Sequence, residues 1–261
     1  MKVIQKGNGE PQYAVTACIH GDEPSGKKAI ERLLDSEYDF KKPVKFVIAN
    51  EEALEKNERF LDVDLNRNFP GDPDSDKHEE RLATKVLEEV KGMKVMDLHS
   101  TRSEPTPFMT LGDISDTVLK LMKGTGVDKA CYFEEESGVM GEYVDAFIVE
   151  AGPQGTEDAV DMAYDILVNY LATLEIIEEE YEKSDPEIFK YYETVRGGDW
   201  EFLKTNFEKV EKGEVFARHG TTELISTEEF YPVLMSTDGY EDILGQKARK
   251  MGRASVIDLR R

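Results

Sequence analysis

Short apolar runs alternate with amphipathic stretches along the first two thirds of the chain. Runs of β-branched and aliphatic residues predict four buried strands, over Tyr13–Ile19, Val44–Ala49, Lys94–Leu98 and Asp145–Val149. Apolar residues at helical spacing predict helices over Ser25–Leu34, Asp76–Val90 and Glu157–Glu178. Strands separated by helices favour an α/β fold, with a mostly parallel mixed sheet and helices on both faces. In such a sheet, ligand sites lie beyond the carboxyl ends of the strands.

The pattern changes near Tyr181–Pro186, a charged stretch that ends in proline and predicts a linker. Short apolar segments follow at Tyr191–Arg196, Glu214–Arg218 and Tyr231–Met235, with glycines between them. We therefore expect two units: a main domain over residues 1–183, and a small β-rich C-terminal domain over residues 184–261.

Charge and cysteine content restrict the class of partner and the location of the protein. The 261 residues carry 33 basic and 55 acidic side chains, a net charge of −22. Phosphate backbones and anionic membranes repel such a surface, which argues against nucleic acid and membranes as partners. Two cysteines exclude a disulfide framework and a cysteine-based zinc cluster. No apolar run approaches the roughly 20 residues that span a bilayer. We expect a cytoplasmic protein and leave a homo-oligomer open.

Two of the four histidines directly follow predicted strands. His20 begins the tetrapeptide HGDE, which places Glu23 three residues later, and His99 follows the third strand. Two histidines and one glutamate form the ligand set of hydrolytic zinc sites. Taken alone, His-x-x-Glu more often marks a histidine that is hydrogen-bonded in a turn. His78 and His219 lie in polar surroundings and are expected at the surface.

Two further segments supply groups for chemistry. Glu150 ends an apolar run, where a carboxylate near an activated water has the position of a general base. Arg59, Asn66 and Arg67 fall within nine residues, and an arginine beside an amide can hold a carboxylate. Both have a plainer interpretation: Glu150 as an acid that caps a helix, and the arginines as charges that neutralise nearby acids. Asp97 is a candidate hydrogen-bond partner of His99.

Four motifs stand in these segments: HGDE at His20–Glu23, DLNRNF at Asp64–Phe69, DLHST at Asp97–Thr101 and VEAGPQG at Val149–Gly155. Together they resemble the aspartoacylase and succinylglutamate desuccinylase family of the zinc carboxypeptidase superfamily, in which the motifs have the same order. Arg59 stands five residues before Asp64, as the family's arginine does, and Tyr231–Val233 followed by Tyr240 is similar to the family's C-terminal tyrosine region. The resemblance runs nearly from end to end.

The resemblance implies a zinc-carboxypeptidase-like fold with one Zn²⁺ per chain. It also implies hydrolysis of the linear amide C–N bond of a small N-acyl amino acid by metal-activated water. His20, Glu23 and His99 would bind the zinc ion. Glu150 would exchange protons with the attacking water and the leaving amine, and Arg59 would stabilise the oxyanion.

The resemblance further assigns the substrate's carboxylate to Asn66, Arg67 and Tyr240, under a C-terminal domain that caps the active site. A metallocarboxypeptidase acting on short peptides would use the same ligands and the same arginine–asparagine pair, so it stays open as an alternative. Two readings from other classes are a non-catalytic sensor of small carboxylates on the same scaffold and a zinc-free structural domain.

One position departs from the family pattern. Aspartoacylases carry a further arginine ten residues before the catalytic glutamate, where this chain has Met140. No arginine lies between Arg102 and Arg196, so only Arg102 or Arg218 is considered as a replacement. The sequence therefore does not assign N-acetylaspartate as the substrate and leaves the acyl group and the amino acid open.

Overall fold

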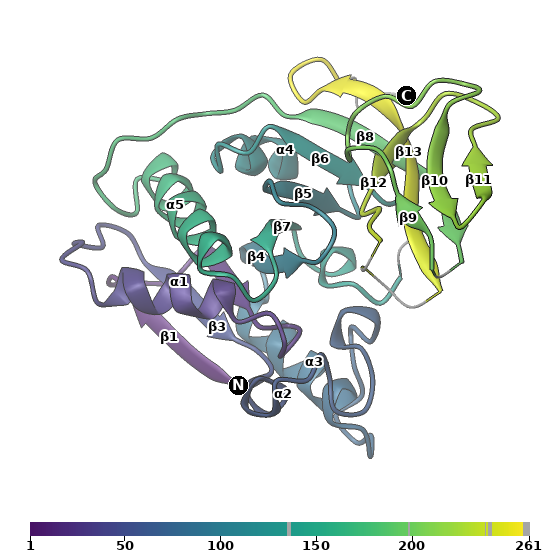
Figure 1. Cartoon of the computed structure of the whole chain (residues 1–261). Helices are drawn as coiled ribbons and strands as arrows, with labels where there is room; N and C mark the ends of the chain where they lie inside the picture. The colour runs from purple at the N-terminus through teal and green to yellow at the C-terminus, as the bar shows by residue number, and fades with distance from the viewer. Residues whose placement is uncertain (135–136, 198, 238, 240–241, 258–261) are drawn as a thin grey trace.

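One mixed sheet of ten strands forms the centre of the part of the chain that the computed structural model describes, residues 1–134, 137–197, 199–237, 239 and 242–257 (Figure 1). The strand order is β1-β3-β2-β4-β7-β5-β6-β8-β13-β12. Strands β3, β2, β4 and β7 run parallel to one another, as do β5, β6 and β8. The strands are β1 (Lys2–Lys6), β2 (Tyr13–Ala17), β3 (Val44–Ile48), β4 (Lys94–Thr101), β5 (Phe108–Leu111), β6 (Lys129–Tyr132), β7 (Ala146–Pro153), β8 (Glu187–Arg196), β12 (Tyr231–Val233) and β13 (Ile243–Arg253).

Helices cover both faces of this sheet, as expected. On one face, Phe46 and Ile48 of β3 belong to the same apolar cluster as Ile30 of α1. On the other, Val47 belongs to a separate cluster with Leu82 of α3. Successive side chains of a strand point to opposite faces of the sheet. A strand that is buried on both faces therefore has apolar residues at consecutive positions. The helices are α1 (Ser25–Leu34), α2 (Glu51–Lys56), α3 (His78–Val90), α4 (Asp116–Lys123) and α5 (Glu157–Thr173), with 3₁₀ turns η1 (Leu65–Arg67) and η2 (Met140–Glu142).

Several element ends differ from the sequence prediction. The first strand ends at Ala17 because Cys18 takes a left-handed backbone conformation, with φ of 56°. Strands β4 and β7 run three and four residues beyond the expected ends, so His99 and Glu150 lie inside strands rather than after them. The last long helix ends at Thr173 rather than Glu178.

The C-terminal region is rich in β-structure, as expected. Strands β8, β13 and β12 continue the large sheet, and β9 (Glu201–Phe202), β10 (Val215–His219) and β11 (Thr222–Ile225) form a small antiparallel sheet beside it. A shared apolar cluster joins Phe108 and Phe133 to Phe189 and Phe207, so packing is continuous across residue 184. The division into two domains there stays a prediction.

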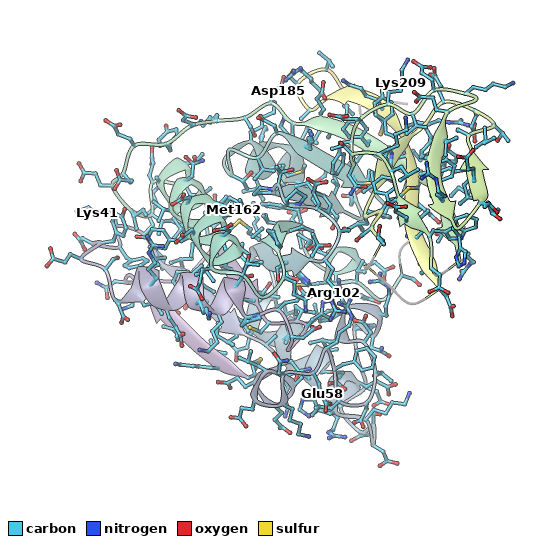
Figure 2. All side chains as sticks on the ribbon, in the orientation of Figure 1. Lys41, Glu58, Arg102, Met162, Asp185 and Lys209 are labelled. Atoms are coloured by element: carbon cyan, nitrogen blue, oxygen red, sulfur yellow. The ribbon has the colours of Figure 1, made fainter. Side chains whose placement is uncertain are left out.

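Charged side chains dominate the outside of the molecule. Figure 2 shows Lys41 and Lys209 at the periphery, and both make exposed ion pairs, Lys41 with Asp39 and Lys209 with Glu211. Such pairs add little stability because water screens them. Within the described ranges, no helix combines the length and the apolar character needed to cross a membrane.

Candidate active site

A cavity of about 290 Å³ lies at the carboxyl ends of β2, β4 and β7. It brings together residues that the sequence spreads over 130 positions. Tyr240, the last predicted site residue, lies outside the described residues. The predicted residues that line the cavity are His20, Glu23, Arg59, Asn66, Arg67, His99 and Glu150.

The turn after β2 brings His20 next to the segment that carries Arg59. Gly21 donates its N–H to the Arg59 carbonyl, at 3.0 Å. A Cβ atom at Gly21 would lie 2.3 Å from the Ala53 carbonyl carbon and 2.5 Å from the Glu58 carbonyl oxygen. Only glycine allows this approach, because real Cβ contacts are never that short. The HGDE turn therefore requires its glycine for packing against the end of α2.

Glu23 lies between the two histidines. Its Oε1 is 2.9 Å from His20 Nδ1, and its Oε2 is 3.0 Å from His99 Nδ1. The N–H of Ser100 donates to Oε2 at 3.1 Å, and Arg59 donates to Oε1 at 3.1 Å. All three members of the His20–Glu23–His99 cluster are buried, with candidate ligand atoms within 4.8 Å of one another.

The Nε2 atom of each imidazole contacts one aspartate. Asp64 Oδ1 lies 3.0 Å from His20 Nε2, and Asp97 Oδ2 lies 2.8 Å from His99 Nε2. Thr16 donates to the other oxygen of Asp97 at 2.6 Å. Carboxylates in this position orient metal-binding histidines and fix the tautomer that presents the free nitrogen to the ion. Asp97 thus lies where the sequence proposed it.

The donor set fits a divalent transition metal. Both Nδ1 atoms face Glu23, while both Nε2 atoms are engaged by carboxylates, so His20 and His99 present one nitrogen each to the same point. Two imidazoles and a carboxylate match the ligands of hydrolytic zinc centres. A buried His20–Glu23–His99 group can therefore bind a metal ion.

Electrostatics in the cluster support the same interpretation. Burial alone would lower the pKa of His20 and of His99, but neighbouring carboxylates outweigh it and raise the pKa of both imidazoles. Burial would raise the pKa of Glu23, yet the two imidazoles hold it well below the ordinary value. The cluster is thus a buried place where positive charge is favoured, and a metal ion would replace the protons.

Glu150 stands directly beside this cluster. It pairs with His99 in the parallel register of β4 and β7. Its Oε2 is enclosed and has no hydrogen-bond partner among the described residues. Burial raises the pKa of Glu150 to about 7. A carboxylate that is enclosed and titrates near neutrality is suited to accept and return a proton.

The loop that leads to Asn66 and Arg67, on the 3₁₀ turn η1, is anchored by a buried acid that the sequence did not indicate. Glu79, on the first turn of α3, accepts the N–H groups of Leu61, Asp62 and Val63 at 2.7, 3.0 and 3.2 Å. Its Oε1 also accepts from Asn50 Nδ2 at 3.0 Å. Burial would raise the pKa of Glu79, but these hydrogen bonds hold it below the ordinary value.

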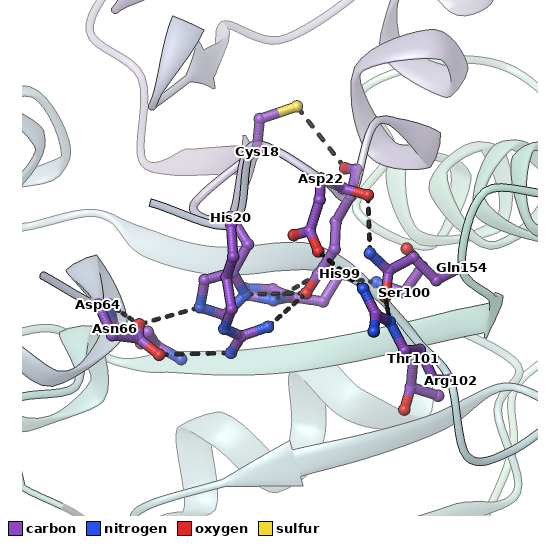
Figure 3. A network of polar contacts seen from close by, with 12 residues as sticks. Cys18, His20, Asp22, Asp64, Asn66, His99, Ser100, Thr101, Arg102 and Gln154 are labelled. Atoms are coloured by element: carbon purple, nitrogen blue, oxygen red, sulfur yellow. Dashed lines mark hydrogen bonds and ion pairs between the residues drawn. The ribbon is translucent and has the colours of Figure 1, made fainter. Parts of the chain in front are cut away.

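The remaining candidate residues lie elsewhere. Arg102 donates to Gln154 Oε1 at 3.0 Å and lies 3.4 Å from Asp22, outside the cavity lining (Figure 3). Arg218 is on β10, with Nε 3.8 Å from Glu223. Met140 is buried in the apolar cluster around α3.

The other two histidines are also outside the metal-ligand cluster. His219 is exposed, and His78 is half-buried, with Nε2 3.2 Å from Asn50 Oδ1.

Comparison with known proteins places these observations in a family. The family model for the succinylglutamate desuccinylase/aspartoacylase catalytic domain matches residues 10–172, more than half of the chain. A succinylglutamate desuccinylase of Shewanella frigidimarina is 24% identical over 264 residues, which cover 85% of this chain and 77% of the relative.

Solved structures show the same fold. A succinylglutamate desuccinylase/aspartoacylase of Rhodobacter sphaeroides superposes with a TM-score of 0.78 at 19% identity, covering 96% of this chain and 89% of that one. A product-bound ectoine utilization protein, EutE (DoeB), of Ruegeria pomeroyi gives a TM-score of 0.77 at 20% identity, covering 95% and 87%.

Proposed function

The chain belongs to the succinylglutamate desuccinylase/aspartoacylase family of hydrolases, and from this premise we propose that it is a zinc-dependent amidohydrolase cleaving the amide bond of a small N-acyl amino acid. The observation that carries the proposal is the convergence of two imidazole Nδ1 atoms and Glu23 beside the unpartnered Oε2 of Glu150. Family membership supports hydrolysis, and the donor set supports zinc.

We assign the metal to His20, Glu23 and His99, with one ion per chain. Bound Zn²⁺ would supply a Lewis acid that lowers the pKa of water and polarises a carbonyl group. Asp64 and Asp97 keep the two imidazoles oriented through their Nε2 atoms.

The chain's own groups would carry the proton and the charge. Glu150 accepts the proton of the attacking water at its carboxylate and returns it to the leaving amine nitrogen. Arg59, held against Glu23 and Asp64, stabilises negative charge on the former carbonyl oxygen. Asn66 and Arg67 orient the substrate through its carboxylate. Tyr240 is proposed to close over it.

The size of the cavity favours a small substrate over a polypeptide. About 290 Å³ accommodates a short acyl amino acid. Leu234, Ile243 and Gln246 form part of its wall, which supports the proposal that residues 184–261 cap the site.

Amine release by the zinc-loaded protein tests the proposal. The panel holds N-acylamino acids with different acyl groups and side chains, and a set of tripeptides. Glu150→Gln should keep zinc and lose at least about 100-fold in rate, because it removes the proton acceptor. Glu157→Gln, at an exposed residue that pairs with Lys28, is the matched control and should keep full activity.

The panel also separates the alternatives. Release from tripeptides alone would establish the metallocarboxypeptidase instead. Zinc binding without any turnover would favour a sensor of small carboxylates. Full activity of Glu150→Gln would remove Glu150 from the mechanism.

A further inference from the structure

The cavity has a second part that the proposed mechanism does not use. Its charged side chains belong to the site described above. Apart from Gly245, every other lining residue has an uncharged side chain, and we call this set the neutral wall. It consists of Thr110, Phe133, Ile148, Leu234, Ile243 and Gln246.

Contacts behind the cavity hold the neutral wall in place. The ring of Phe133 stacks on Tyr191, with centroids 5.2 Å apart. Thr194 donates its hydroxyl to Gln246 Oε1 at 2.8 Å, and the Tyr191 hydroxyl lies 3.0 Å from the Thr194 oxygen. Gln246 is therefore fixed by neutral hydroxyl groups and not by a charge.

Two of the segments that contribute to the neutral wall carry no cationic side chain. Segments 133–142 and 234–246 contain no lysine, arginine or histidine, whereas they carry seven acidic residues. This count comes from the sequence and so includes positions outside the described residues. Arg196 pairs with Ile243 between β8 and β13, but it is exposed and is absent from the described lining.

The balance of charge therefore allows for one substrate carboxylate. Arg59 faces Glu23 and Asp64, which offset its charge. Under the proposed function, Arg67 and Asn66 take the carboxylate beside the scissile amide. A second carboxylate, on the acyl group or on the side chain of the substrate, would have to move from water to the neutral wall. No opposite charge compensates it there, which is strongly unfavourable. An apolar arm would instead gain from burial.

Resting on the proposed function, we propose that the substrates are monocarboxylates: N-acyl amino acids whose acyl group and side chain are both uncharged. The neutral wall selects against a second carboxylate. Selectivity of this kind comes from leaving the wrong ligand unpaired, not from an added attraction to the right one.

Matched pairs of substrates test this selectivity. N-acetylmethionine and N-acetylglutamate differ in charge at similar length, and N-butanoylmethionine and N-succinylmethionine do the same on the acyl side. The uncharged member of each pair should have a kcat/KM at least about 100-fold higher, since an unpaired buried group gives strong discrimination. Equal or faster hydrolysis of the dicarboxylates would overturn the proposal.

Binding separates this proposal from the proposed function. Failure to hydrolyse any compound would contradict the enzyme assignment alone. Calorimetry on zinc-loaded Glu150→Gln then decides the selectivity. N-acetylmethionine should bind at least about tenfold more tightly than N-acetylglutamate, and equal or reversed affinities would refute the neutral wall.

A designed cation provides the reciprocal test. Gln246→Lys should raise kcat/KM for N-acetylglutamate relative to N-acetylmethionine by about tenfold or more, because it supplies the missing charge. Gln246→Met has similar length without charge and should not shift the ratio toward the dicarboxylate. An unchanged ratio in Gln246→Lys would show that the second arm does not meet the neutral wall.

Discussion

Two glutamates with enclosed carboxylate oxygens, Glu79 at the start of α3 and Glu150 in β7, have opposite electrostatic surroundings. Each carboxylate oxygen of Glu79 accepts two hydrogen bonds, and its pKa is held below the ordinary value. Glu150 has an Oε2 without a partner among the described residues, and burial raises its pKa to about 7. Hydrogen bonds to the charged form thus mark Glu79 as a structural carboxylate, whereas burial without such partners leaves Glu150 available for proton transfer.

The site has two regions that are held in place in different ways. His99 and Glu150 are neighbours on β4 and β7, so the backbone ladder fixes their distance. Asn66 and Arg67 lie on the 3₁₀ turn η1, and the buried Glu79 holds the loop just before this turn through backbone N–H groups. Changes in the first region should alter chemistry, and changes in the second should alter substrate positioning.

The largest expected effect is on the stability of the metal-free protein carrying Glu150→Gln. The pKa of Glu150 rises from 4.5 to about 7 on folding. The wild type should therefore lose stability as the pH increases from about 4.5 to about 7, because only the unfolded chain releases the proton there. At about 1.4 kcal/mol per pKa unit the loss reaches about 3 kcal/mol, and glutamine avoids it.

Urea unfolding of both metal-free proteins at pH 5 and pH 8 checks this prediction. The variant should gain stability relative to the wild type between the two values. A difference that does not change with pH would mean that Glu150 is not an unpaired acid in the folded protein.

The opposite sign is expected for Glu79→Gln. Glutamine keeps one acceptor oxygen and turns an NH₂ group toward backbone donors, which should cost about 2 kcal/mol at pH 7. Because folding lowers the pKa of Glu79, its contribution is complete above about pH 4.5 and disappears as the pH falls further. The deficit of the variant should therefore shrink in acid, as measured by urea unfolding between pH 3 and pH 7.

Glu80→Gln is the matched control for this prediction. Glu80 is the next residue on α3, and its partners are Ser75 and Lys77 near the surface. The control should cost less than about 1 kcal/mol. Equal losses of stability in the two variants would mean that the hydrogen bonds of Glu79 to the backbone of residues 61–63 do not stabilise the fold.

Local patterns in the sequence predicted the fold class and several elements well. The helix over Ser25–Leu34 has its expected bounds, because its apolar spacing alone determines which face is buried. Strands β4 and β7 were predicted too short, since the polar His99 and Glu150 interrupt their apolar runs and become strand only by pairing with each other or with β5. Polar strand residues at a site are invisible to a hydrophobic pattern.

The residues of the site also fall into those that the sequence indicated and those that it missed. The sequence indicated His20, His99 and Glu150, because polar residues that end apolar runs are conspicuous. It did not indicate Glu79, which looks like an ordinary acid in the first turn of a helix. The contacts of Glu79 join it to residues 16 to 29 positions away, and no local pattern encodes them. The Asp64 contact with His20, 44 residues apart, was missed for the same reason.

Arg67→Ala sharpens the contrast between chemistry and positioning. Losing a charged hydrogen-bond donor should raise KM about 10- to 100-fold for carboxylate-bearing substrates, with a smaller change in kcat. Arg102→Ala removes an arginine outside the cavity lining and serves as the control. Steady-state kinetics are measured on a substrate and on its analogue in which the carboxylate is replaced by an amide. An equal rise in KM for the amide analogue would contradict a carboxylate-binding role of Arg67.

The smallest difference between matched variants is expected at Gly138, which packs against the segment that carries Arg67. A Cβ there would lie 2.2 Å from the Arg67 carbonyl oxygen, and Phe69 donates its N–H to the Gly138 carbonyl at 3.0 Å. Gly92 has nearly the same φ, 74° against 73°, with no atom within 4 Å of an added Cβ. Both alanine variants bear the strain of a left-handed alanine, about 1–2 kcal/mol.

Only Gly138→Ala must also displace the segment that carries Arg67. It should therefore lose at least about 1 kcal/mol more stability than Gly92→Ala, as an overpacked site does. It should also raise KM while kcat changes less, because the strand-borne groups stay in register. Urea unfolding and steady-state kinetics on the two variants measure both effects. If Gly138→Ala lowered kcat and left KM unchanged, the loop would be part of the chemistry, and the contrast between the two regions would be wrong.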